Sequence, residues 1–238
     1  MSTLLQLIQQ FSARRLLPAP TIAVASQDDQ VLQLIGLMNE VLEDLTTRYV
    51  GTALQKVATW VSTAVEDQGP ITTLAPYGFK WMINDTFWDR DARLPVFGPK
   101  SPQEWETLKA TPMTGPYLQY RIQGGNLLFN GGGIPANHNM AFEYASDWAV
   151  KAQDGVTFKP WFTADTDSSV FPDNLLLAGL NWRWRLEKGL VYAEAFRDYE
   201  AKVADFNGHD GSKSEISMDG GPDGWQPGIW VPTANWNL

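Results

Sequence analysis

The stretch Ile71–Lys109, ITTLAPYGFKWMINDTFWDRDARLPVFGPKSPQEWETLK, separates a helical pattern on its N-terminal side from a strand pattern on its C-terminal side. It holds Trp81, Trp88 and Trp105, three of the 11 tryptophans of the chain. It is also rich in proline, which fixes a backbone angle and interrupts regular helices and strands. Large side chains and fixed turns in one segment indicate a rigid joint. We therefore expect the three tryptophans to act as structural anchors.

Short elements are expected in and beside this stretch. Residues Glu66–Pro70 are rich in turn-forming residues and predict a turn. Residues Phe79–Asn84 predict a helical turn, whereas Thr86–Trp88 and Arg93–Val96 predict short strands. Near the end, Ser-Pro-Gln-Glu at 101–104 has serine, proline and glutamate at the positions of a capping box, which predicts the start of a helix.

The N-terminal side is helical in pattern. Apolar residues within Thr3–Arg15 fall on one stripe and predict a short helix, which Pro18 and Pro20 then end. A second and longer helix is expected up to Arg48, with Ser26 as its N-cap. Its apolar residues recur at spacings of three and four, which requires a packing partner on one face. They are Val31, Leu34, Ile35, Met38, Val41, Leu42 and Leu45.

The middle of the chain has the alternation of β-strands. We expect a strand within Leu54–Val65 and a hairpin around Gly124-Gly125, in which Tyr117–Gln123 pairs with Asn126–Asn130. This register places Ile122 opposite Leu127 and Tyr120 opposite Phe129, so both strands present apolar side chains on the same face.

A third strand is expected around Met140, Phe142 and Tyr144, and the three strands predict an antiparallel meander that packs on the helices by one face. The pattern then becomes helical again. Leu175–Leu186 and Leu190–Phe206 predict two helices that are joined at Gly189.

These elements predict an α+β fold. Helices from both chain ends, in residues 1–53 and 166–207, are expected to form one helical bundle. Residues 54–165 are expected to form an inserted antiparallel β domain, and residues 208–238 an extended C-terminal arm.

The last segment has its own composition. Glycine and proline make a long helix or a core strand unfavourable there, yet its large apolar side chains are unlike those of a disordered linker. We expect this arm to order against a partner protein or another copy of the chain. Packing of the arm on its own domain is the alternative. The expected contact residues are Trp225, Ile229, Trp230, Val231 and Trp236.

Charge and composition exclude several classes of function. A net charge of −9 argues against a protein that mainly grips nucleic acid, because that grip depends on lysine and arginine. The absence of cysteine excludes disulfides and thiolate metal sites. Neither a secretory signal nor a membrane-spanning segment is expected from the apolar pattern.

Catalytic motifs are not found in the sequence. His138 and His209 lie in glycine-rich surroundings and are expected to be exposed loop residues. Residues Asp165–Ser169 resemble a calcium loop, but Val170 and Leu176 occupy positions that require glycine and glutamate, so a turn is expected. We expect no catalytic residue, no cofactor and no metal.

One alternative stays open. Asp85, Asp89 and Asp91 lie close in sequence to Trp81 and Trp88, and paired carboxylates beside aromatic platforms are typical of sugar-cleaving sites. A carbohydrate-binding or polysaccharide-cleaving protein is therefore one possible function. An open cleft at these tryptophans would favour it, and burial of the tryptophans would not.

The chain resembles the head-to-tail adaptor proteins of short-tailed bacteriophages over most of its length. The motifs that carry the resemblance are LLQLIQQF with LPAP, VLQLIGLMNEVLEDL, NDTFWDR with RLPVFGPKSPQEW, TGPYLQYRIQGGNLLF and YAEAFRDYEAKVADF. None of them is a catalytic signature.

The resemblance implies a structural protein of the virion neck, assembled in the host cytoplasm. It implies a ring of twelve subunits that joins the portal protein to a tail nozzle or tail hub protein and continues the DNA channel. Its partners are then other copies of itself and these two proteins, while genomic DNA passes without sequence-specific binding. An acidic channel wall would let DNA slide through. A related tail-tube or nozzle component is a further alternative.

Overall fold

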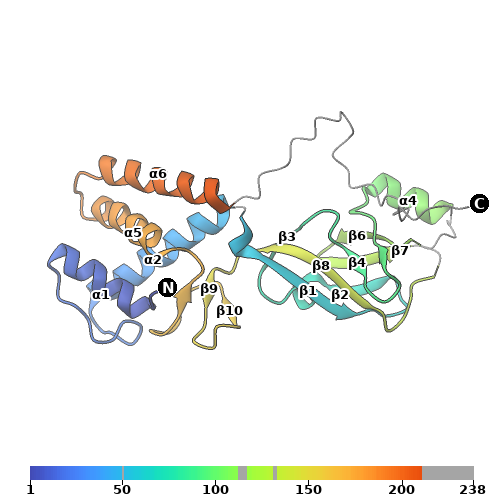
Figure 1. The fold of residues 1–238 in the computed structure, drawn as a ribbon, viewed down its shortest axis with the longest axis horizontal. Helices are drawn as coiled ribbons and strands as arrows, with labels where there is room; N and C mark the ends of the chain where they lie inside the picture. Colours follow the sequence, from blue (N-terminus) through green and yellow to red (C-terminus); the bar gives the residue numbers. More distant parts are fainter. Residues whose placement is uncertain (50, 112–116, 131–132, 211–238) are drawn as a thin grey trace, which may run out of the picture.

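The computed structural model describes residues 1–49, 51–111, 117–130 and 133–210, and the fold is mixed α and β. Helices from the two ends of the chain lie together on one side of the molecule, and most of the strands lie on the other (Figure 1). The arm residues Trp225, Ile229, Trp230, Val231 and Trp236 lie outside the described residues.

Helix α1 (Leu4–Arg15) begins with a capping box. The side chain of Thr3 accepts a hydrogen bond from the Gln6 amide, and the Gln6 side chain accepts one from the Thr3 amide. The first turn is also bound from outside, because the amide of Leu4 donates to the carbonyl of Asp167 at 2.8 Å. One side of α1 is buried through Leu4, Leu7, Ile8 and Phe11.

Helix α2 (Asp29–Arg48) begins two residues later than Ser26 predicted. Asp28 is the N-cap, since its carboxylate accepts from the Gln30 amide at 2.9 Å. The hydroxyl of Ser26 instead accepts from the Asp28 amide, so it stabilises the turn that precedes the helix. The predicted apolar stripe is confirmed, except that Ile35 is only partly buried. A short 3-10 helix, η1 (Thr52–Leu54), follows.

Helices α5 (Asp173–Glu187) and α6 (Ala193–Asp210) confirm the second helical part. They are joined by a turn in which Gly189 has a φ of 66°, a conformation that glycine adopts without strain. Tyr192 was predicted inside the second helix but precedes it. The extended arm was expected to begin at residue 208. The helix instead continues through Gly208 to Asp210.

The helices share one apolar core with the segment that leads into α5. In Figure 1, α5 lies between α2 and α6, and α1 packs beside α2 and α5. The buried side chains include Leu42 and Leu45 of α2, Leu176 and Leu180 of α5, and Tyr199 of α6.

Gly179 allows α5 to approach α2 and α6 closely. A Cβ atom at this position would lie 2.6 Å from Cγ1 of Val41 and 3.1 Å from Cε2 of Tyr199. Gly36, in the exposed face of α2, would meet nothing within 4 Å. We expect Gly179→Ala to lower the free energy of unfolding by up to about 2 kcal/mol, because overpacking costs about 1–3 kcal/mol and is offset by a gain of about 1 kcal/mol in helix propensity.

Gly36→Ala is the matched control, since it has the same gain in helix propensity and no clash. It should raise the free energy of unfolding by about 0.5–1 kcal/mol. Urea denaturation followed by circular dichroism measures both. Stabilisation of the protein by both substitutions would show that the helices can separate at Gly179 without loss.

The larger sheet is built around β8 (Asn139–Ser146). It pairs with β1 (Gln55–Val61) along one edge, and with β3 (Phe79–Met82) and β4 (Trp88–Asp89) along the other, while β5 (Leu94–Pro95) pairs with β4. The helical turn predicted at 79–84 is therefore wrong. Its residues pair with Tyr144, Ala145 and Ser146, whose buried strand needs a partner on both edges.

A second sheet has the order β2-β7-β6, from β2 (Asp67–Pro70), β7 (Asn126–Asn130) and β6 (Gln119–Gln123). The predicted hairpin is confirmed, with Tyr120 opposite Phe129 and Ile122 opposite Leu127. The turn predicted at 66–70 is wrong, because these residues extend the hairpin as a third strand with a bulge. The predicted meander is also wrong, since β8 belongs to the other sheet.

The two sheets enclose a separate apolar core. Phe87 lies at its centre, with ring centroids 5.0 Å from Tyr120, 5.7 Å from Phe129 and 5.6 Å from Phe142. The expectation that the apolar face of the strands packs on the helices is therefore wrong, because the two sheets cover each other. Two short helices lie beside them, α3 (Ile71–Leu74) and α4 (Pro102–Ala110), and α4 begins with the predicted capping box of Ser101 and Glu104.

A third, small sheet returns the chain to the helices. It consists of β9 (Val150–Lys151), β10 (Phe158–Lys159) and β11 (Ser168–Ser169), in the order β10-β9-β11. Val150 and Phe162 belong to the helical core. We call the helices with this small sheet the helical lobe, and the two larger sheets with α3 and α4 the β lobe.

Candidate functional site

The three predicted tryptophans lie in different surroundings. Trp105 is 1% exposed on α4, within the β lobe. Trp81 on β3 is half-buried, with Nζ of Lys80 4.5 Å from its ring centroid, and it borders a hollow of about 240 Å³. Trp88 on β4 is half-buried and lines a second, larger hollow on the β lobe.

This hollow, which we call the Trp88 groove, lies on the outer face of the sheet and has a volume of about 510 Å³. The pairing of β8 with β4 explains its floor, because Ala141 and Trp88 both line the groove and lie opposite each other in neighbouring strands. Val57 borders it and is 54% exposed. The exposed charged side chains along it are Asp85, Arg90, Arg93 and Glu143.

The outer face of β1 is more apolar than a solvent-facing strand requires. The alternation predicted within Leu54–Val65 is present from Gln55 to Val61, but its valines face outward. Val61 is 55% exposed, and Ala58 faces the core instead. A sheet face with exposed valines beside a tryptophan is typical of a contact surface.

An aspartate, a histidine and a serine come together at one end of β8. His138 lies in a loop as expected but is only partly exposed, and its Nδ1 lies 2.7 Å from Oδ2 of Asp89. The hydroxyl of Ser62 donates to the carbonyl of Pro135 at 2.7 Å and accepts from the backbone amide of His138.

These contacts do not form a catalytic triad. Among the described residues no hydrogen bond joins the Ser62 hydroxyl to the His138 ring, and Ser62 is 2% exposed. Asp89 also accepts from the amides of Asp91 and Ala92, which commits its carboxylate to the turn between β4 and β5. Asp91 accepts from Asn139, and these hydrogen bonds lower the pKa of Asp91. The cluster therefore stabilises a turn.

Asp165 and Asp167 bind backbone amides and a lysine. The carboxylate of Asp165 accepts from the amides of Ala23 and Val24, at 3.0 and 2.7 Å. Asp167 is 1% exposed and accepts from the amide of Thr163 and from Nζ of Lys159, both at 2.9 Å. Asp165 and Thr166 form a turn as predicted, whereas Ser168 and Ser169 form β11. Among the described residues no group of three or more potential ligand side chains could hold a metal ion.

Lysines occupy the joint between the two lobes. Nζ of Lys80 on β3 donates to the carbonyl of Thr46 at 2.7 Å, in the last turn of α2, where a positive charge is favourable. Nζ of Lys56 on β1 is buried without a hydrogen-bond partner among the described residues and lies over the ring of Phe158. Burial, with the nearby charge of Lys151, lowers the pKa of Lys56 to about 7.

Lys56→Met is expected to stabilise the protein in a pH-dependent way. The folded pKa of about 7 lies below the value of about 10.4 in an unfolded chain, so the unfolded state binds more protons between these values. The penalty of the charged amine is therefore complete below pH 7 and disappears as the pH rises toward 10. The variant should melt at a higher temperature than the parent at pH 6, and the difference should shrink by pH 10.

Lys109→Met is the control for this prediction, because the ion pair of Lys109 with Glu66 is on the surface. Thermal melts of the three proteins from pH 6 to pH 10 measure the effect. A melting difference for Lys56→Met that does not change with pH would contradict the assigned cause.

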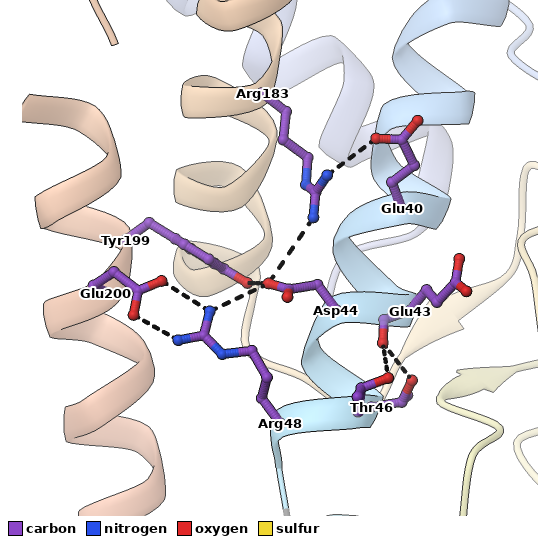
Figure 2. Close-up of polar contacts among 9 residues, drawn as sticks. Glu40, Glu43, Asp44, Thr46, Arg48, Arg183, Tyr199 and Glu200 are labelled. Carbon is purple, nitrogen blue, oxygen red and sulfur yellow. Dashed lines mark hydrogen bonds and ion pairs between the residues drawn. The ribbon is translucent and has the colours of Figure 1, made fainter. Parts of the chain in front are cut away.

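A polar network fixes α2 against α5 and α6 (Figure 2). The guanidinium of Arg48 donates to both carboxylate oxygens of Glu200, at 2.8 and 2.5 Å, and this hydrogen bonding raises the pKa of Arg48. Asp44 accepts from the hydroxyl of Tyr199 at 2.8 Å, while Arg183 binds Glu40 at 3.1 Å. Burial and then the contact with Asp44 raise the pKa of Tyr199. The charged groups of Arg48 and Arg183 pair with the carboxylates of Glu200, Asp44 and Glu40, so the network holds the helices in place.

The turn between α5 and α6 exposes a cluster of apolar side chains, which we call the apolar turn. It lies at the end of the helical lobe that points away from the β lobe (Figure 1). Its members are Leu186 (44% exposed), Leu190 (49%), Val191 (81%), Tyr192 (42%) and Phe196 (38%). The ring of Phe196 packs edge-to-face against Trp182 and is otherwise exposed.

Neither a scan against protein-family models nor a search of curated proteins finds a match for the chain. In the part of the chain that the structure describes, no helix is long and apolar enough to cross a membrane.

The geometry therefore offers surfaces for contact more than a site for chemistry. The Trp88 groove and the apolar turn lie in different lobes and differ in shape and residue type. Sequence reasoning singled out Trp88 but missed the apolar turn. The signal was the Leu-Val-Tyr run directly after Gly189, since a turn of this kind is usually polar.

Proposed function

We propose that the protein is a head-to-tail adaptor of a bacteriophage virion, whose subunits form a ring, of twelve by resemblance, that joins the portal to the tail. Two unlike exposed apolar surfaces in different lobes support this proposal best. A closed ring needs heterologous contacts, in which one surface of a subunit meets a different surface of the next. The apolar turn and the outer face of β1 supply such a pair.

The layout agrees with this role. In the proposal the helices of both chain ends act as one bundle, the β domain is inserted between them, and the arm from residue 208 extends to a partner. Trp225, Ile229, Trp230, Val231 and Trp236 then contact the portal or a neighbouring subunit, because tryptophans dominate the energy of interfaces. The ring lies in the neck of the virion, meets the tail nozzle or hub protein on its other side and lets DNA pass.

Electron microscopy of the purified protein, alone and mixed with a portal protein, tests the proposal. We expect negative-stain class averages of twelve-fold rings that cap the portal. A compact monomer that ignores the portal and hydrolyses polysaccharide would contradict it. Basic side chains along the channel of such a ring would contradict the acidic channel wall.

Val191→Asp is expected to prevent ring formation while the subunit stays folded. Val191 is 81% exposed, so the folded subunit loses little, whereas a carboxylate buried in an interface without a partner is costly. Val156→Asp is the matched control, because Val156 is 67% exposed in the turn between β9 and β10. Class averages and melting temperatures of both variants measure the effect. Rings formed equally well by both variants would exclude the apolar turn from the interface.

A carbohydrate-binding tail protein is the second candidate, because Trp88 lines an open groove with exposed carboxylates and arginines beside it. Such a groove provides an aromatic platform and polar groups for a sugar. Binding of the purified protein to an array of bacterial polysaccharides tests it. Binding that Trp88→Ala abolishes would favour this candidate over the adaptor.

A further inference from the structure

The Trp88 groove has the features of a site that another segment of chain covers. Its volume of about 510 Å³ lies within the range of sites that bury a ligand. Its border includes Val57, which is 54% exposed although β-branched and apolar. The charged groups along it have both signs, so charge alone does not select an occupant. Apolar contact and proximity therefore decide which segment or molecule occupies the groove.

The C-terminal segment of this protein, residues 211–238, has a matching composition. It contains Trp225, Trp230 and Trp236, together with Ile229 and Val231, and its glycines and prolines favour an extended chain. Indole rings combine a large apolar area with a polar N–H group, which suits a half-apolar groove.

The segment also starts at the joint between the lobes, from which β1 leads to the groove. Helix α6 runs toward the joint between the lobes and ends at Asp210 (Figure 1). Near this end the ring of Phe206 lies 4.9 Å from the ring of Tyr49, shortly before β1 begins at Gln55. Val57 is therefore close along the chain to the joint. About 15 residues separate Asp210 from Trp225, and an extended chain of that length spans about 50 Å.

We propose that, in the free subunit, the tryptophans of this C-terminal segment occupy the Trp88 groove of the same chain. A tether of this length gives the segment an effective concentration in the millimolar range at the groove, which a separate copy or a free sugar does not reach in dilute solution. This proposal does not depend on the adaptor function, although it would give an adaptor a way to avoid premature contacts.

Thiol labelling of the full chain tests the proposal, because the protein has no cysteine of its own. Val57→Cys places a single thiol at the groove, and Val191→Cys places one on the exposed apolar turn as a control. Each is compared in the parent chain and in a variant with Trp225→Ser, Trp230→Ser and Trp236→Ser. Circular dichroism and melting temperature verify that the folds are equal.

We expect the thiol at position 57 to react about tenfold more slowly in the parent than in the triple-serine variant, as for a segment docked nine-tenths of the time. The thiol at position 191 should react equally in both. The protection should not change on tenfold dilution, because the contact is within one chain. Equal rates at position 57 would overturn the proposal. Protection that disappears on dilution would overturn the assignment to the same chain, and protection that requires added polysaccharide would assign the groove to a sugar.

Discussion

Phe87→Ala is expected to lower the free energy of unfolding by about 3–5 kcal/mol, the largest effect that we predict for a single substitution. Phe87 is 1% exposed and stands between the two larger sheets. Its ring contacts those of Trp60, Tyr120, Phe129 and Phe142 at centroid distances of 5.0 to 5.7 Å. Removal of the ring therefore loses its burial and leaves a cavity that rigid neighbours cannot fill.

Phe97→Ala is the matched control, because Phe97 is 36% exposed and contacts the ring of Tyr117 at the surface. It should cost no more than about 1 kcal/mol. Urea denaturation followed by tryptophan fluorescence measures both variants. Equal losses for the two variants would show that the aromatic cluster does not hold the sheets together.

Asp167→Ala is expected to lower the free energy of unfolding by about 3 kcal/mol, since removal of one partner from a buried ion pair leaves the other uncompensated. The side chain of Asp167 is 1% exposed, and that of its partner Lys159 is 27% exposed. The substitution also leaves the amides of Thr163 and Ala164 without an acceptor. The carbonyl of Asp167 binds the first turn of α1, so the N-terminus of that helix should also loosen.

The pH dependence of this effect has a definite sign. Burial alone would raise the pKa of Asp167, but hydrogen bonds from Lys159 and from two backbone amides outweigh it, and the pKa is lowered. The contribution of Asp167 to stability is therefore present above the unfolded value of about 3.9 and is lost as the pH falls through the folded value.

Asp154→Ala is the control, because Asp154 makes similar hydrogen bonds to Val156 and Thr157 at the surface. Its loss should be much smaller, since water replaces the lost acceptor. Denaturation at pH 7 and at pH 3 compares parent and variants. An Asp167→Ala variant that loses equal stability at both pH values would contradict the ionic contribution.

The parts of the fold that depend on near neighbours in sequence were predictable. The capping box at Ser101 and Glu104 and the register of the hairpin at Gly124-Gly125 each involve groups a few residues apart. The failures concern pairing at a distance. Phe79–Met82 becomes a strand because β8 offers a free edge, and no pattern within these four residues indicates a partner more than 60 positions away.

The candidate surfaces were predictable in part for a similar reason. Trp88 was singled out by its residue type, but its place on the outer face of the sheet follows from its pairing with Ala141. The sequence did not single out Lys56, because the rings of Tyr77 and Phe158 that lie near its amine come from distant parts of the chain. Residue type indicates which side chains are candidates for a surface, whereas long-range contacts decide whether each of them is exposed or buried.

The separation of the two apolar cores has a consequence for how such a chain can change over time. Of the described residues, none belongs to both cores, so a substitution that alters packing in one lobe leaves the packing of the other intact. The polypeptide enters the β lobe after η1 and leaves it before β9, and the two crossing points lie close together in Figure 1. Such a lobe can be exchanged as a cassette, so chimaeras that graft a foreign β lobe between residues 54 and 149 should retain the helical core.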